Sequence, residues 1–376
     1  MTQPRDYGFD EETGMLKDAA ARFFDEKEMV VRLRPHLKGT EDPHRGSDRA
    51  PWYDEASWQE MQELGWHLLA VPESAGGIGM GLVAAVAIQE EIGRAACPTP
   101  LTGTLQATFL LREASLLGGA GADQALAKIA EGTSVALGIF GEAGSPELDA
   151  TAIRAEGNRL TGTSWYVQDA GKVDAFVIAA RSDAGIGLYF VPRDAVTVEQ
   201  DRIVDLSRDQ GRVVLDGAEA EVIAEPGEGE AVLARALPAI LTLIAADMAG
   251  AAEWQLQTTA EYAKVRMQFD RPIGFFQAVK HPIVNMMIAA DETRSLVYNA
   301  ACAYDHEPED ALRCALMAKS SASDTASFCS NRSTQLHGGI GFTWEADVQI
   351  YHKRQMHNQF LFGDGTWQRQ RLAELL

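Results

Sequence analysis

The sequence is poor in cysteine, in positive charge and in long apolar runs. Its 4 cysteines are scattered among 376 residues without a C-x-x-C pair, which fits neither a zinc site nor a disulfide framework. Lys and Arg number 33 against 54 Asp and Glu, and the net charge of -21 argues against nucleic acid and anionic membrane surfaces as partners. We therefore expect buried, reduced thiols, no metal site and no nucleic-acid binding.

The apolar runs are too short to suggest a membrane protein. A membrane helix needs roughly 18 apolar residues in a row. The most apolar segment, 231–252, is interrupted by Arg235, Pro238 and Asp247. Residues 1–6 lack the apolar core of a secretory signal. From these absences we expect no membrane insertion and a cytoplasmic protein.

What is present divides the chain into three compositional zones. Residues 1–132 carry apolar side chains at helical spacing, as between Met15 and Phe23. Residues 133–228 contain short β-rich runs separated by turn residues, which is typical of a small antiparallel sandwich or barrel. Residues 229–376 return to helical spacing in four long segments with short connections, which favours a four-helix bundle.

Two motifs in the last zone carry recognisable chemistry. The segment 266–277 has the sequence R-M-Q-F-D-R-P-I-G-F-F-Q, and the segment 335–341 has the sequence Q-L-H-G-G-I-G. A guanidinium suits a diphosphate because it donates paired, charge-assisted hydrogen bonds, and an aromatic face suits a flat ring. Glycines let a ligand approach the backbone closely. Taken alone, each motif has a structural alternative, namely a cation near a helix C-terminus or a helix stop followed by a turn.

Together with the order of helices, strands and helices, these motifs resemble the acyl-CoA dehydrogenase family of flavoproteins over essentially the whole chain. The resemblance implies an α+β fold with an N-terminal helical domain (1–132), a middle antiparallel β-barrel (133–228) and a C-terminal four-helix bundle (229–376). It also implies FAD as the cofactor and an acyl-CoA as the substrate. The residues implied to contact FAD are Arg266, Phe269, Gln277, Gln335, Gly338, Gly339, Thr366, Gln368, Trp165 and Ser145. Ser145 and Gly365 are implied to contact the substrate. The chain departs from the family pattern where Asp270 replaces a glycine and Val167 a common threonine.

The resemblance assigns the catalytic base to Asp364, which lies in G-D-G-T where the family commonly has Y-E-G-T. The implied reaction removes the α-proton of an acyl thioester while a hydride leaves the β-carbon for the flavin. A carboxylate can accept that proton if desolvation raises its pKa. Aspartate is shorter than glutamate by roughly 1.3–1.5 Å, and a displacement of about 1 Å can cost on the order of 10²-fold in rate. The alternative is an aspartate that stabilises a turn.

Some members of the family carry the base on the first long helix of the bundle. The matching position falls near Ile240, which cannot accept a proton. Asp247 lies two turns later between apolar neighbours, where a polar contact between helices is favoured over a role in catalysis.

The resemblance implies FAD-dependent α,β-dehydrogenation of an acyl-CoA to the trans-2-enoyl-CoA, with electrons passed to an electron-transfer flavoprotein. The implied assembly is a homotetramer or a mixed tetramer with a related chain, and the substrate could be a fatty acyl or a steroid side-chain thioester. Two alternatives stay open. One is a flavin oxidase of the same fold, like the nitroalkane oxidases, and the other is a structural subunit of a heteromeric acyl-CoA dehydrogenase.

Overall fold

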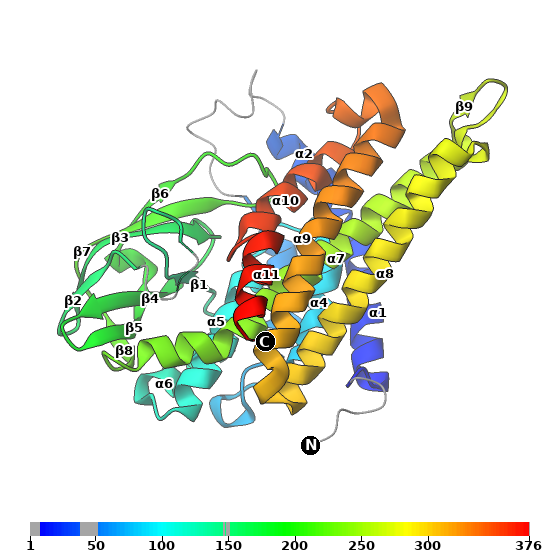
Figure 1. Cartoon of the computed structure of the whole chain (residues 1–376). Helices are drawn as coiled ribbons and strands as arrows, with labels where there is room; N and C mark the ends of the chain where they lie inside the picture. Colours follow the sequence, from blue (N-terminus) through cyan, green and yellow to red (C-terminus); the bar gives the residue numbers. More distant parts are fainter. Residues whose placement is uncertain (1–7, 38–51, 146, 148–150, 376) are drawn as a thin grey trace.

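The structure, a computed structural model, describes residues 8–37, 52–145, 147 and 151–375. Residues 1–6, on which the expectation about a secretory signal depends, lie outside the described residues. Figure 1 shows a sheet on one side of the molecule and a bundle of long helices on the other. The order of helices, then strands, then helices confirms the predicted fold class. The domain boundaries at 132 and 228 stay predictions.

The N-terminal part of the described chain is helical. Its helices are α1 (Glu11–Lys27), α2 (Met29–Leu37), α3 (Glu55–Glu63), α4 (Leu82–Arg94), α5 (Leu101–Leu116) and α6 (Ala120–Ala130). Helix α1 begins after Asp10, whose carboxylate accepts a hydrogen bond from the Thr13 backbone N at 2.8 Å. The first turn of α4 instead donates to Asp305, a residue of the C-terminal bundle. This cap joins the two helical parts of the chain.

The middle part is a mixed, eight-stranded sheet, with the order β6-β7-β3-β2-β4-β5-β8 and β1 beside β4. Its strands are β1 (Val135–Gly138), β2 (Arg154–Glu156), β3 (Arg159–Gln168), β4 (Ala175–Ser182), β5 (Gly185–Pro192), β6 (Thr197–Gln200), β7 (Gln210–Glu219) and β8 (Glu221–Ala224). Strand β4 pairs in parallel with β1 and β2, and the edge strands β6 and β8 do not meet.

The expectation of a closed, antiparallel barrel is therefore corrected to an open, mixed sheet. Two helices pack on this sheet, α5 on β1 and α6 on the edge strand β8. The contact between α6 and β8 brings their two backbones close together. A Cβ added to Gly121 would lie 2.0 Å from the Val222 carbonyl oxygen, so this contact requires glycine.

The C-terminal part is a bundle of long helices. They are α7 (Gly229–Val265), α8 (Gln277–His306), α9 (Pro308–His337), α10 (Val348–Phe360) and α11 (Gly365–Glu374). Short 3-10 turns are η1 (Trp66–Leu68), η2 (Glu73–Ala75), η3 (Arg193–Ala195), η4 (Ile273–Phe275) and η5 (Gly338–Phe342). By length and composition α7 could cross a membrane, yet 83% of its most apolar 18-residue window is buried inside the protein. Helix α7 is thus the core helix of the bundle, in contact with α4, α5, α8 and α9.

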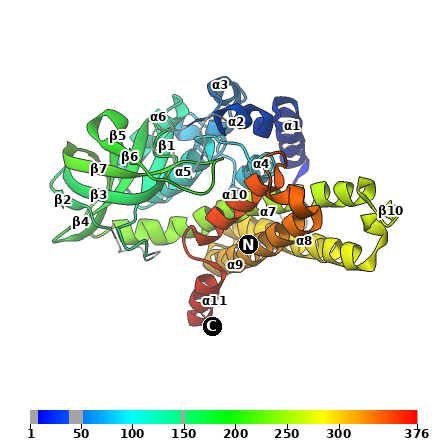
Figure 2. The same ribbon diagram turned by 90° about the horizontal axis from the view of Figure 1, so that it is seen from above.

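A short hairpin joins α7 to α8 and projects from one end of the bundle (Figure 1). It consists of β9 (Met267–Gln268) and β10 (Arg271–Pro272). Its two turn residues, Phe269 and Asp270, have φ angles of 53° and 58°, so Asp270 adopts the left-handed conformation that the usual glycine would adopt. Seen from above, the sheet and the hairpin lie at opposite ends of the molecule (Figure 2).

Candidate functional site

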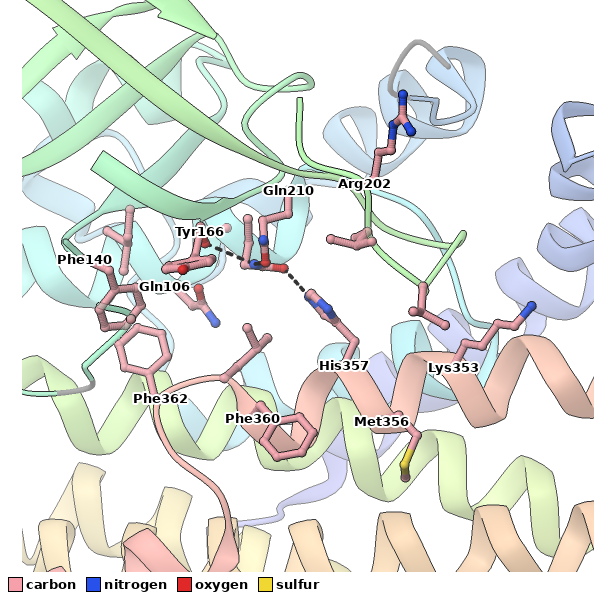
Figure 3. A pocket seen from close by; sticks show the side chains of 17 residues that line it. Gln106, Phe140, Tyr166, Arg202, Gln210, Lys353, Met356, His357, Phe360 and Phe362 are labelled. Carbon is pink, nitrogen blue, oxygen red and sulfur yellow. Dashed lines mark hydrogen bonds between the residues drawn. The ribbon is translucent and has the colours of Figure 1, made fainter. Parts of the chain in front are cut away.

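A cavity of about 550 Å³ lies between the sheet and helix α10 (Figure 3). One end is aromatic, where Phe140 and Phe362 stand next to each other with ring centroids 4.9 Å apart. At the other end lie the cationic side chains of Arg202 and Lys353. The cavity therefore offers an apolar surface to a ligand at one end and positive charge at the other.

The middle of the cavity wall is a chain of neutral polar groups. The Gln168 amide nitrogen donates to Gln210 Oε1 at 2.8 Å and to the Tyr166 carbonyl at 3.1 Å. This fixes the orientation of the Gln168 amide, whose oxygen faces His357 Nε2 at 2.7 Å. His357 Nε2 must then carry the proton that it donates. Burial lowers the pKa of His357 to about 4, so its imidazole is neutral near pH 7.

A bulge in β3 decides which aromatic side chain enters the cavity. The pairing of β3 with β7 shifts between Ser164 and Val167, and Tyr166 has a φ angle of 57°. As a result Tyr166 lines the cavity, and its hydroxyl donates to the Glu142 carbonyl at 2.9 Å. Trp165, the residue predicted to cover the flavin, does not line the cavity; the Arg212 guanidinium stacks 5.2 Å from its ring centroid.

The loop that contains Ser145 reaches the cavity through the preceding residue, Gly144. Gly144 lines the wall, with a φ angle of 62°, whereas Ser145 does not. A Cβ on Gly144 would lie 3.1 Å from the Tyr166 ring. The Ser145 hydroxyl accepts a hydrogen bond from the backbone N of Glu147 at 3.3 Å. The roles of Trp165 and Ser145 stay predictions, while Tyr166 is a wall residue that sequence reasoning missed.

Asp247 forms a buried polar hub beside the cavity. Its two oxygens accept hydrogen bonds from Arg354 at 2.9 and 2.6 Å, from Asn358 at 2.7 Å and from Gln89 at 3.0 Å. Arg208 also contacts it at 2.9 Å. Burial alone would favour the neutral acid, but the Arg208 and Arg354 guanidinium groups hold the pKa of Asp247 down to about 2. Asp247 thus joins α4, α7, α10 and the loop between β6 and β7, and α10 and that loop line the cavity.

Asp364, the predicted base, does not line the cavity. It is the N-cap of α11, and its Oδ1 accepts a hydrogen bond from the Trp367 backbone N at 2.8 Å. Gly365 packs against α9, where an added Cβ would lie 2.8 Å from Asp324 Oδ1. Thr366 is exposed. The geometry shows the turn-stabilising alternative in place, and the base role stays a prediction.

The turn before Asp364 is held by two fully buried polar side chains. The Gln368 amide donates to the carbonyls of Phe362 at 2.6 Å and Gly363 at 3.1 Å. The Lys319 ammonium donates to the carbonyls of Gln359 at 3.0 Å and Gly363 at 3.1 Å. Burial lowers the pKa of Lys319 to about 7. Gln368 therefore supports the backbone of this turn, and sequence reasoning did not find Lys319.

The remaining predicted FAD contacts gather at the hairpin end of the bundle. Tyr262 and His337 stack with ring centroids 4.4 Å apart and bring together the segments 266–277 and 335–341. All the predicted residues there are exposed: Arg266, Phe269, Gln277, Gln335, Gly338 and Gly339. No atom would lie within 4 Å of a Cβ added to Gly338 or Gly339. This backbone is open to a ligand, and the hairpin beside it projects away from the sheet (Figures 1 and 2).

Among the described residues, no group of three or more His, Cys, Asp or Glu side chains could hold a metal ion. All 4 cysteines lie in the described residues, are buried and form no disulfide.

Comparison with known proteins gives consistent matches along the chain. Residues 10–132 match the family model of the acyl-CoA dehydrogenase N-terminal domain, and residues 227–376 match that of the C-terminal domain. Acyl-CoA dehydrogenase IpdE2 of Mycobacterium tuberculosis is 34% identical over 311 residues, which cover 82% of each chain.

Two solved structures share the fold over nearly the whole length. A variant of the Tcur3481-Tcur3483 steroid ACAD superimposes with a TM-score of 0.82 at 27% identity, over 97% of each chain. The ChsE4-ChsE5 complex of Mycobacterium tuberculosis superimposes with a TM-score of 0.83 at 25% identity, over 98% of each chain.

Proposed function

Because this chain belongs to the acyl-CoA dehydrogenase family, as an FAD-dependent oxidoreductase, we propose that it converts an acyl-CoA to the trans-2-enoyl-CoA. The observation that carries the proposal within this fold is the cavity between the sheet and α10. It combines an apolar, aromatic end, neutral hydrogen-bonding groups and a cationic rim. Such a cavity suits an acyl chain and a flat ring system next to each other. We propose an electron-transfer flavoprotein as the electron acceptor.

The residues present fit FAD in two separate places. The cavity offers aromatic rings and the amides of Gln106, Gln168 and Gln210 to a flat, polar-edged ring. The hairpin end offers the Arg266 guanidinium to a diphosphate and the open backbone of Gly338 and Gly339 to an adenosine. When bound, FAD supplies the acceptor for the hydride that leaves the β-carbon.

The sheet that forms one wall of the cavity and the hairpin lie at opposite ends of the molecule (Figure 2). This arrangement favours a cofactor that extends from the cavity of one chain to the hairpin end of another. We therefore propose that the protein works as an oligomer in which the hairpin end of one chain completes the cavity of another. The solved structures named above carry two protein names each, Tcur3481-Tcur3483 and ChsE4-ChsE5, which supports a mixed assembly as readily as a homotetramer.

The position of Asp364 favours a second candidate function, that of a subunit which binds but does not catalyse. Its carboxylate caps α11 and does not face the cavity. In a mixed assembly the base would then come from the related chain, and this chain would contribute its hairpin and its glycine turn.

Substitutions of Asp364 distinguish its role as the N-cap of α11 from a role as the catalytic base. Asn caps a helix about as well as Asp, whereas Ala costs about 1 kcal/mol of stability. If Asp364 is the base, Asp364→Asn keeps its FAD and its stability but no longer bleaches the flavin when acyl-CoAs are added without oxygen. Asp364→Ala should no longer bleach the flavin, and its free energy of unfolding should fall by about 1 kcal/mol. Asp364→Glu tests whether the missing methylene limits the rate.

Normal bleaching in Asp364→Asn would refute the base role. A chain that is inert alone, and active only after co-expression with a related chain, would support the structural subunit. Rapid reoxidation of the flavin in air without formation of an enoyl-CoA would support the oxidase alternative.

A further inference from the structure

Phe362 closes the aromatic end of the cavity. Its ring faces Phe140 edge-on across the gap between the sheet and the bundle (Figure 3). On its other side it packs against buried residues of α7 and α9, namely Leu237, Leu241, Ala315 and Leu316. Beyond this ring lies the interior of the bundle. By contrast Phe360, which also lines the cavity, is 65% exposed and belongs to the rim.

The backbone that presents this ring is strained and firmly held. Phe362 has a φ angle of 56°, a left-handed conformation that is unusual for an aromatic residue. Such a conformation persists where the surroundings fix it, and it commonly marks a functional position. Here Gln368 and Lys319, both fully buried, bind the carbonyls of the turn. The backbone that presents the ring therefore cannot shift without breaking buried hydrogen bonds.

We infer that Phe362 is the floor of the acyl pocket and sets the length of the acyl group that the protein accepts, an inference that depends on the proposed function. An acyl chain that enters between the sheet and α10 ends against this ring. Removal of the ring opens the pocket toward Leu237 and Leu241, an apolar space in which further methylenes are buried. Each buried methylene increases the affinity about fourfold, so two added methylenes should increase the affinity more than tenfold.

The experiment measures the affinity of a series of saturated acyl-CoAs, from four to sixteen carbons, by perturbation of the flavin spectrum without oxygen. In Phe362→Ala we expect the tightest-binding chain length to increase by two or more carbons. Phe362→Gly should give the same shift, and it also relieves the left-handed strain. Phe362→Leu, which keeps most of the apolar packing, should give a smaller shift and serves if Phe362→Ala does not fold.

The matched control is Phe360→Ala, which also removes a phenyl ring, but at the rim of the cavity. It should change the affinity for all chain lengths by the same factor. A length profile that stays unchanged in folded, FAD-containing Phe362 variants overturns this inference and leaves the proposed function intact. If no acyl-CoA of any length binds to the unaltered protein, the proposed function and this inference are both rejected.

Discussion

The cavity end and the hairpin end of this protein differ in how far their side chains find partners within one chain. Around the cavity, buried charges such as Asp247 and Arg354 have their partners within the chain. At the hairpin end, Phe269, Phe275 and Phe342 are 85%, 56% and 77% exposed. Exposed aromatic residues gathered in one place mark a surface that binds something else. The comparison teaches that folding alone pairs the buried charges around the cavity, whereas it leaves the aromatic side chains of the hairpin end exposed.

The largest expected effect tests the cavity end. Asp247→Asn leaves the Arg208 and Arg354 guanidinium groups buried without their carboxylate, so we expect the free energy of unfolding to fall by about 3–5 kcal/mol. Denaturant unfolding measures the change. The control is Glu219→Gln at the exposed Arg159–Glu219 pair, which should change stability by less than about 1 kcal/mol. Equal effects of the two variants would contradict the importance of the hub.

A smaller effect is expected on the pH dependence of stability, through His357 in the cavity wall. The pKa of His357 is about 4 in the folded protein because of burial, against roughly 6.5 in the unfolded chain. As the pH falls, the His357 imidazole therefore binds a proton in the unfolded chain before it does so in the folded protein. The stability that this residue contributes above pH 6.5 is lost as the pH falls from 6.5 to 4. We expect this loss to be about 3 kcal/mol by pH 4.

His357→Gln removes the titrating group and keeps a donor for Gln168. Unfolding free energies measured between pH 7 and pH 4 should therefore fall less steeply in the variant than in the unaltered protein. Parallel pH profiles of the two proteins would show that His357 is not held neutral by its surroundings.

The smallest expected effect on stability tests the hairpin end. Phe269→Ser removes an 85% exposed ring, so we expect the free energy of unfolding to change by less than about 0.5 kcal/mol. FAD retention after gel filtration and the oligomeric mass should nevertheless decrease. The control is Leu116→Ser, an apolar residue of α5 that is 72% exposed and lies outside both motifs. If both variants retain FAD alike, the hairpin is not a cofactor-binding or assembly surface.

The sequence predicts the helices and the fold class because helical spacing and helix-ending glycines are local signals. The closed barrel was wrong because the parallel pairing of β4 with β1 and β2 depends on contacts between distant segments. Tyr166 escaped prediction for a related reason. A bulge shifts the register of β3 by tertiary contacts, and nothing in the sequence from Ser164 to Val167 reveals it.

The candidate site was predicted in part. The family resemblance implied that the segments 266–277 and 335–341 bind the same cofactor, and in the structure the two segments meet through Tyr262 and His337. The position of this group relative to the cavity depends on how the long helices pack, which residue patterns do not give. Lys319 was missed because a single lysine in a helix carries no signal of distant partners. Besides the nearby Ser323 hydroxyl, it binds backbone carbonyls 40 and 44 residues away.

The contact between α4 and α7 limits how this protein can move. A Cβ on Gly93 would lie 2.0 Å from the Asp247 carbonyl oxygen, and one on Gly250 would lie 1.8 Å from that of Glu90. Because the two backbones touch at both glycines, a side chain at either position would force α4 and α7 apart. We therefore expect a motion that admits a ligand to the cavity to move the sheet or α10 rather than to separate α4 from α7.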